Sequence, residues 1–75
     1  MIYPRWDPDL GWEIGDREAV IIRDGEPLVF ESKLDCQLAV ISLLLAGITT
    51  LEQMEMADRE YIDYLIQRVM PCHVF

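Results

Sequence analysis

The sequence predicts one small α+β domain over residues 1–75, in which an aromatic N-terminal arm and a small antiparallel sheet precede two or three C-terminal helices. Three observations predict this class. The pair Asp24-Gly25 separates two apolar runs, as in a β-hairpin with a two-residue turn. Helix-start signals at Ser32 and Thr50 follow only after that hairpin. No internal repeat or linker divides the chain.

The length and net charge of the chain argue against several classes of function. A chain of 75 residues has a marginal core, and a hydrophobic share of 52% argues against disorder. Fourteen acidic residues against six basic ones give a net charge of −8. This sign disfavours direct nucleic-acid binding and attraction to anionic membranes. Because the chain shows neither a signal-like nor a membrane-spanning apolar segment, we expect a cytoplasmic protein.

Residues 1–16 are expected to form an ordered but irregular arm, with at most a short strand at residues 12–14. Prolines and glycines interrupt the segment, yet it carries both tryptophans of the chain, Trp6 and Trp12. Two interpretations remain open. The aromatic side chains pack over the core, or they form an exposed contact surface, because Trp and Tyr are frequent binding hot spots.

Residues 18–31 predict a β-hairpin with strands at residues 19–23 and 28–30. A two-residue turn pairs Arg23 with Glu26 across the strands. The same register continues through the pairs Ile22–Pro27, Ile21–Leu28, Val20–Val29 and Ala19–Phe30. Both faces of this hairpin are apolar, so the helices must cover one face and the arm or a second subunit the other.

Residues 32–46 predict a helix that Ser32 caps at its start and Gly47 ends. Its apolar residues form two stripes on opposite sides. One contains Leu34, Leu38, Ile41 and Leu45, and the other contains Cys36, Val40, Leu43 and Leu44. A helix that is apolar on all sides is normally buried on all sides, which a chain this short cannot easily achieve alone.

Residues 50–70 predict one helix or two short ones, begun by a capping box at Thr49 or Thr50 and ended by Pro71. Asp58 lies in the middle of the apolar face. Either Asp58 is buried and paired within one helix, or it caps a second helix. We favour the break, because an unpaired buried carboxylate is costly.

We expect no enzyme, no metal and no cofactor. The sequence contains no glycine-rich phosphate loop. Cys36 is predicted to be a small buried side chain in the first helix. Cys72 and the lone His73 do not supply the four ligands of a zinc site, and a position this close to the C-terminus is unsuited to a preorganised base.

The acidic residues fall into two groups. The arm carries Asp7, Asp9, Glu13 and Asp16, and the last helical region carries Glu52, Glu55, Glu60 and Asp63 on its outer face. Two interpretations remain open. The groups dock on a basic protein surface or imitate the charge of DNA, or they only keep an apolar protein soluble.

In size and charge alone, the chain is similar to small acidic accessory proteins of phages and mobile elements that bind and block a host enzyme. This likeness implies a protein-binding regulator or inhibitor whose partner has a basic surface. The alternative is a structural or assembly protein that acts through its own oligomer. We also expect a homodimer or a heterologous complex, since the two-sided apolar elements need a cover. The candidate apolar contacts are Trp6, Trp12, Val20, Ile22, Val29, Leu38, Ile41 and Leu45.

Overall fold

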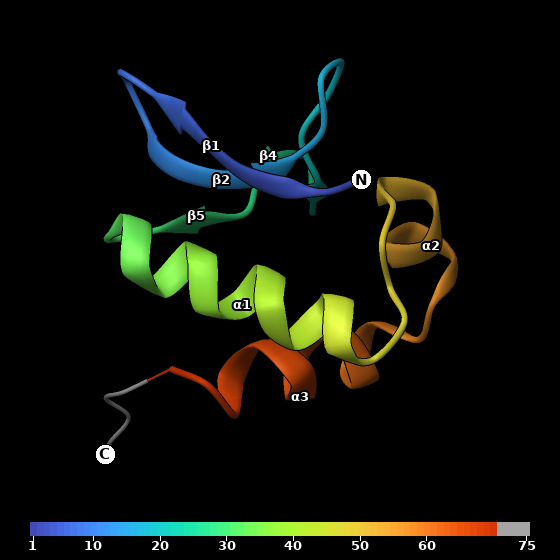
Figure 1. Cartoon of the computed structure of the whole chain (residues 1–75). Coiled ribbons are helices and arrows are strands. Elements are labelled where there is room, and N and C mark those ends of the chain that lie inside the picture. Colours follow the sequence, from blue (N-terminus) through green and yellow to red (C-terminus); the bar gives the residue numbers. More distant parts are fainter. Residues whose placement is uncertain (71–75) are drawn as a thin grey trace.

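The computed structural model describes residues 1–70 and confirms the α+β class (Figure 1). In chain order, the elements are β1 (Tyr3–Asp7), β2 (Gly11–Gly15), β3 (Ile22–Arg23), β4 (Glu26–Pro27), β5 (Val29–Phe30), α1 (Lys33–Leu45), α2 (Leu51–Met56) and α3 (Arg59–Gln67). Within the described residues, no helix is long and apolar enough to cross a membrane.

The elements form layers around α1. An antiparallel sheet of order β1-β2-β5 lies on one side of α1, and α3 lies on another, while α2 closes one end (Figure 1). The core between these layers includes Ile2, Ile14, Phe30, Cys36 and Leu43, each at most 8% exposed. Burial of these side chains is the main force that holds the layers together.

The expected irregular arm is wrong, because residues 3–15 form the hairpin of β1 and β2. Tyr3 pairs with Gly15 and Trp6 with Trp12. Pro4 is compatible with β1, since that strand lies at an edge of the sheet where a missing N–H is tolerated. The sequence did not reveal the hairpin because its turn, residues 8–10, lacks the usual Asn-Gly or Asp-Gly signal.

The hairpin of β3 and β4 is confirmed at its tip and wrong at its base. Asp24 and Gly25 have φ values of +56° and +83°, as a type I′ turn requires, and the predicted pairs Arg23–Glu26 and Ile22–Pro27 form. The N–H of Leu28 also donates to the carbonyl of Ile21, at 3.3 Å. Beyond these residues the two strands separate: Val29 and Phe30 pair with β2, and Val20 forms a bridge with Gly15. Phe30 is 8% exposed, and its strand partner in the core is Trp12 of β2 instead of the predicted Ala19.

The first helix begins and ends as predicted. The Ser32 hydroxyl accepts a hydrogen bond from the Asp35 N–H at 3.1 Å. At the other end, Gly47 has a φ of +86°, and the N–H of Ile48 donates to the Leu43 carbonyl at 2.9 Å. This pattern is a Schellman C-cap, which satisfies carbonyls that the helix end leaves free.

The predicted helix break at Asp58 is confirmed. Thr50 and Gln53 form a complete capping box at the start of α2, so Thr50 rather than Thr49 is the cap. Asp58 caps α3 by accepting a hydrogen bond from the Glu60 N–H at 2.8 Å. The predicted stop at Pro71 lies outside the described residues, while α3 itself ends at Gln67.

Candidate protein-binding surfaces

The end of the β1–β2 hairpin gathers aromatic and acidic side chains. The rings of Trp6 and Trp12 lie 5.2 Å apart at 51°, and the Lys33 ammonium lies 5.5 Å from the Trp12 ring centre. Trp12 packs partly on the core, whereas Trp6 is 60% exposed. Trp12 therefore packs on the core, as one of the two interpretations expects, and Trp6 is exposed. We call Trp6, Asp7, Asp9, Leu10 and Trp12 the hairpin surface.

The turn of this surface is held by its own carboxylate. Asp7 Oδ1 accepts hydrogen bonds from the N–H groups of Asp9, at 2.8 Å, and Leu10, at 3.1 Å. This Asx turn presents Asp9 and Leu10 to solvent, with Leu10 49% exposed. Aromatic, apolar and negatively charged groups therefore lie together on a short and ordered segment.

Glu13 does not belong to an exposed acidic face, contrary to the prediction. Its side chain is only 4% exposed on the middle strand β2, and it lies in register between Arg5 of β1 and Val29 of β5. Burial raises the pKa of the Glu13 carboxyl, and the nearby Asp7 charge adds to the rise, while Arg5 opposes it. The sequence pattern alone could not show that Glu13 is buried, because residues 1–16 were expected to form an irregular arm that pairs with no neighbouring strand.

Asp16 has a structural role in the described fold. Its Oδ1 accepts hydrogen bonds from the N–H groups of Glu18, at 2.8 Å, and Ala19, at 3.0 Å. These bonds lower the pKa of the Asp16 carboxyl. Asp16 is half-buried and closes a turn after β2, whereas Asp9 is exposed.

The second acidic group is divided between two helices. Glu52 and Glu55 are exposed on α2, and Glu60 is exposed at the start of α3. Asp63 is half-buried and forms an ion pair with Arg23 of β3. Three of the four predicted carboxylates are therefore exposed, whereas the ion pair of Asp63 joins the β3–β4 hairpin to α3.

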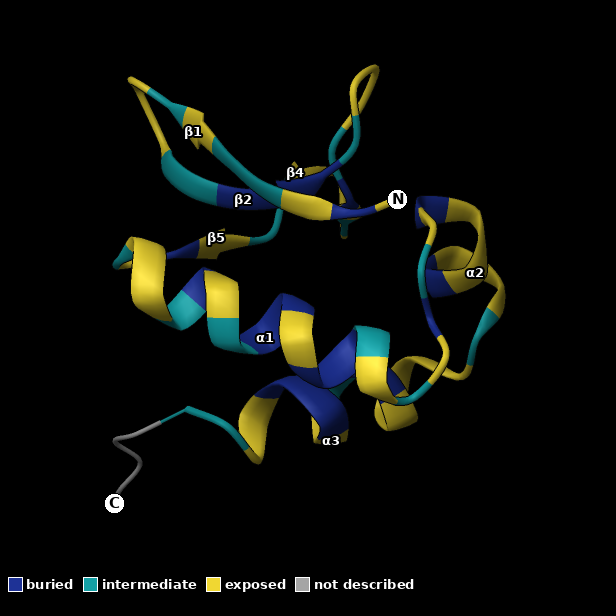
Figure 2. Cartoon of the chain, in the orientation of Figure 1, coloured by how far each residue is buried: buried dark blue, intermediate teal, exposed yellow. Residues whose placement is uncertain are grey.

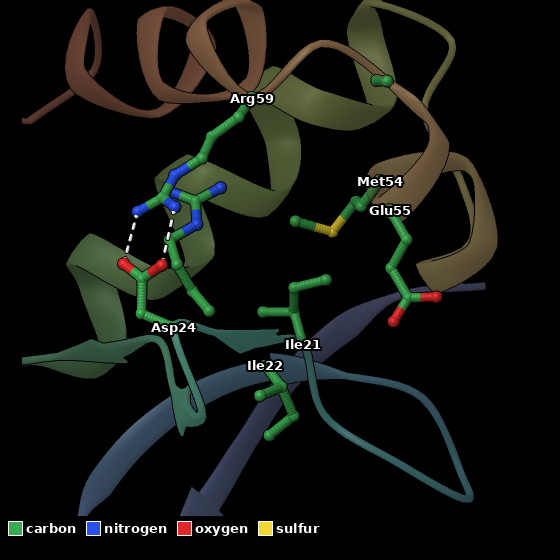
Figure 3. A pocket seen from close by; sticks show the side chains of 8 residues that line it. Ile21, Ile22, Asp24, Met54, Glu55 and Arg59 are labelled. Carbon is green, nitrogen blue, oxygen red and sulfur yellow. Dashed lines mark hydrogen bonds and ion pairs between the residues drawn. The ribbon is translucent and has the colours of Figure 1, made fainter.

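A pocket of about 200 Å³ lies between the β3–β4 hairpin and the junction of α2 and α3. Its apolar wall includes Ile21 and Met54 (Figure 3). At its rim, Arg59 and Asp24 point toward one another and form two hydrogen bonds, of 2.9 and 2.8 Å (Figure 3). The charges of Arg59 and Asp24 compensate each other, and the exposed Glu55 carboxylate also lines the pocket. We assign the pocket no ligand.

The predicted apolar contacts do not share one face. Ile22 lies at the pocket, Val20 is half-buried beside Gly15, and Val29 is 41% exposed on β5. On α1, Ile41 and Leu45 are 47% and 80% exposed, and Leu38 is half-buried. Exposed and buried segments alternate along α1 (Figure 2). The site prediction missed exposed apolar residues that the helical repeat could have revealed, namely Leu34, Tyr61 and Tyr64.

The described cysteine is buried, as predicted. Cys36 Sγ donates a weak hydrogen bond to the Glu13 carbonyl oxygen at 3.4 Å. Burial raises the pKa of the Cys36 thiol to about 12, with the Glu13 charge as a smaller cause. Cys72 and His73 lie outside the described residues. Among residues 1–70, no three His, Cys, Asp or Glu side chains are grouped to hold a metal ion.

Comparison with known proteins gives no relative for this chain. No family model matches it, and neither a curated protein nor a solved structure does.

Proposed function

We propose that this protein is a small binding module that docks on a basic surface of a partner protein through the hairpin surface, and so regulates or inhibits that partner. The observation that carries the proposal is Trp6, which is 60% exposed beside the carboxylates of the turn. Tryptophan is one of the residue types enriched among binding hot spots. A partner lysine or arginine gains both a cation–π contact with Trp6 and attraction to Asp9.

Long-range charge supports the same partner. A net charge of −8 attracts a basic surface and raises the association rate at low salt. Exposed Glu52, Glu55 and Glu60 add to this field. Protein docking accounts for the exposed tryptophan, which imitation of DNA charge alone leaves unexplained.

The proposal invokes no catalysis. The Cys36 thiol is buried and its pKa is raised to about 12, so it is a poor nucleophile near neutral pH. A cytoplasmic location is part of the proposal, and the free thiol of Cys36 is compatible with a reducing compartment.

Affinity capture with matched variants tests the proposal. We expect wild-type protein to retain a stoichiometric partner with a basic surface, and Trp6→Ala to lose at least about 2 kcal/mol of binding free energy. Asp9→Lys should weaken binding mainly at low salt. Met56→Ala is the apolar control, because Met56 is 80% exposed on α2, outside the hairpin surface. Glu18→Lys is the charge control, because Glu18 is exposed and belongs to neither acidic group.

The proposal fails if Trp6→Ala and Asp9→Lys retain the captured partner as well as both controls do. It also fails if the binding constant does not decrease as salt increases. A second candidate function, assembly through the protein's own oligomer, is favoured by the exposed face of α1.

A further inference from the structure

One face of α1 is apolar and uncovered. Leu34, Ile41 and Leu45 are 61%, 47% and 80% exposed, and Leu38 between them is half-buried. At 3.6 residues per turn, these four positions form one stripe, opposite the buried residues Cys36, Ala39, Val40 and Leu43. Their spacing of four, three and four residues is that of a coiled-coil seam. We call this stripe the α1 seam.

The apolar surface continues onto α3. Arg68 Nε donates to the Ser42 hydroxyl at 3.0 Å, and this hydroxyl donates to the Leu65 carbonyl at 2.7 Å. The Arg68 guanidinium also lies 5.7 Å from the ring centre of Tyr64. Tyr64, which is 60% exposed, therefore lies on the side of α3 that adjoins the α1 seam. Tyr61, 47% exposed, is one turn earlier on the same helix.

We propose that the α1 seam pairs antiparallel with the α1 seam of a second copy of the chain. The spacing of four, three and four reads the same in both directions along the helix. A two-fold axis at the level between Ala39 and Val40 therefore places Leu34 against the partner's Leu45 and Leu38 against the partner's Ile41. Such an isologous contact covers both seams at once.

The area of the surface fits a dimer of modest stability. Taking about 150–250 Å² for each large side chain, the exposed fractions of the seam and the two tyrosines correspond to roughly 500 Å² per copy. This is near the upper limit for an apolar patch on a monomer. Two copies together would bury about 1,000 Å², which is near the lower limit for a specific interface.

Charges beside the seam are complementary in the same arrangement. Asp35 and Ser42 are seven residues apart and lie on the same flank of the seam. Ser42 is only 2% exposed, but Arg68, which donates to its hydroxyl, is exposed. Charged groups on this flank form ion pairs between coiled-coil helices. Antiparallel pairing brings Asp35 of one copy toward Ser42 of the other, where Arg68 is bound. Within residues 1–70, no ion pair joins Asp35 or Arg68 to another side chain. The dimer supplies each with a partner.

Sedimentation measurements over a range of concentrations test the dimer. We expect Leu45→Glu to raise the dimer dissociation constant at least about tenfold. Met56→Glu should leave it unchanged, because Met56 is also 80% exposed but lies on α2. Asp35→Arg alone should weaken the dimer, and Asp35→Arg combined with Arg68→Glu should recover part of the loss. Circular dichroism of each variant separates lost association from lost folding.

Two further measurements test the dimer independently: the relative orientation of the two α1 helices and the salt dependence of association. A mixture of Leu38→Cys and Ile41→Cys chains, in a Cys72→Ser background, should crosslink to each other faster than either crosslinks to itself. Because two bodies of charge −8 repel, higher salt should strengthen the dimer or leave it unchanged. Docking on a basic partner has the opposite salt dependence, and Trp6→Ala should not affect the dimer, so the two proposals can fail separately.

The dimer is refuted by a wild-type protein that stays monomeric at submillimolar concentration. Equal effects of Leu45→Glu and Met56→Glu would exclude the α1 seam as its site. Preferential crosslinking of Leu38→Cys with itself would exclude the antiparallel arrangement.

Discussion

Asp24 and Arg59 join the tip of the β3–β4 hairpin to the first residue of α3 through two parallel hydrogen bonds, of 2.9 and 2.8 Å. Next to this pair, Arg23 of the hairpin forms an ion pair with Asp63, one turn further along α3. Each element supplies one cation and one anion, so the two pairs fix the orientation of the hairpin on the helix. Both side chains of the Asp24–Arg59 pair are largely exposed, and its contribution to stability is therefore modest.

Acid should weaken the Asp24–Arg59 pair. The hydrogen bonds and charge of Arg59 hold the pKa of the Asp24 carboxyl below 3.8, so folding favours the ionised form. The stabilisation is present above 3.8 and is lost as the pH falls through the lower folded pKa. Asp24→Asn keeps a residue that tolerates positive φ. We expect this variant to be less stable than wild type near neutral pH and equally stable in strong acid, in urea unfolding. If Asp24→Asn is also less stable than wild type in strong acid, the loss of stability comes from the turn and not from the ion pair.

Glu13 should show the opposite pH dependence. Burial raises the pKa of its carboxyl above 4.5, so folding favours the protonated form. The corresponding stability is present below 4.5 and is lost as the pH rises through the folded pKa. Glu13→Gln should therefore be more stable than wild type at neutral pH, and the gain should shrink below 4.5 in the same unfolding measurement. If the variant is instead less stable at neutral pH, Arg5 compensates the buried charge.

Removal of the α3 cap should lower stability measurably. Asp58→Ala leaves the Glu60 N–H without the carboxylate that accepts its hydrogen bond. We expect the free energy of unfolding to fall by about 0.5–2 kcal/mol. Asp58→Asn, which retains a capping oxygen, is the matched control and should lose less. If Asp58→Ala unfolds at the same midpoint as wild type, the break between α2 and α3 does not depend on the cap.

Gly15 should not accept a larger side chain. A Cβ atom there would lie 2.4 Å from the Ala19 carbonyl oxygen and 2.9 Å from Arg5 Cδ. Because the nearer atom belongs to the backbone, Gly15→Ala should cost about 1–3 kcal/mol in thermal or urea unfolding. Gly25 has a φ of +83° and open space around it, so Gly25→Asn should cost less than about 1 kcal/mol. Equal losses for the two variants would contradict the close approach at Gly15.

Local signals predicted the parts of the fold that local chemistry decides. Ser32, Gly47 and Asp58 each cap or end a helix through contacts with residues close in sequence. The Asp24-Gly25 turn likewise sets the register of its nearest pairs. In each case a short motif contains both partners of the interaction, which is why the sequence was sufficient.

Long-range pairing was not predictable in the same way. β2 pairs with β5, which places Trp12 opposite Phe30 and Glu13 opposite Val29. No local motif in either segment specifies which strand becomes its partner. Glu13 is buried because of that pairing. Since the pairing was not predicted, Glu13 was wrongly assigned to the surface. By contrast, the period of α1 did separate Leu34, Leu38, Ile41 and Leu45 from the core stripe. The period could not show which of the two stripes the sheet and α3 would cover.

The buried thiol of Cys36 makes the opening of the fold chemically observable. The side chain has no exposed surface and lies where α1 contacts β2. A thiol reagent can reach it only after these two elements separate. In a Cys72→Ser background, the rate of modification at high reagent concentration would equal the rate of that separation, and at low concentration it would report the opening equilibrium. Cys36 thus serves as a built-in probe for a fully buried part of the core.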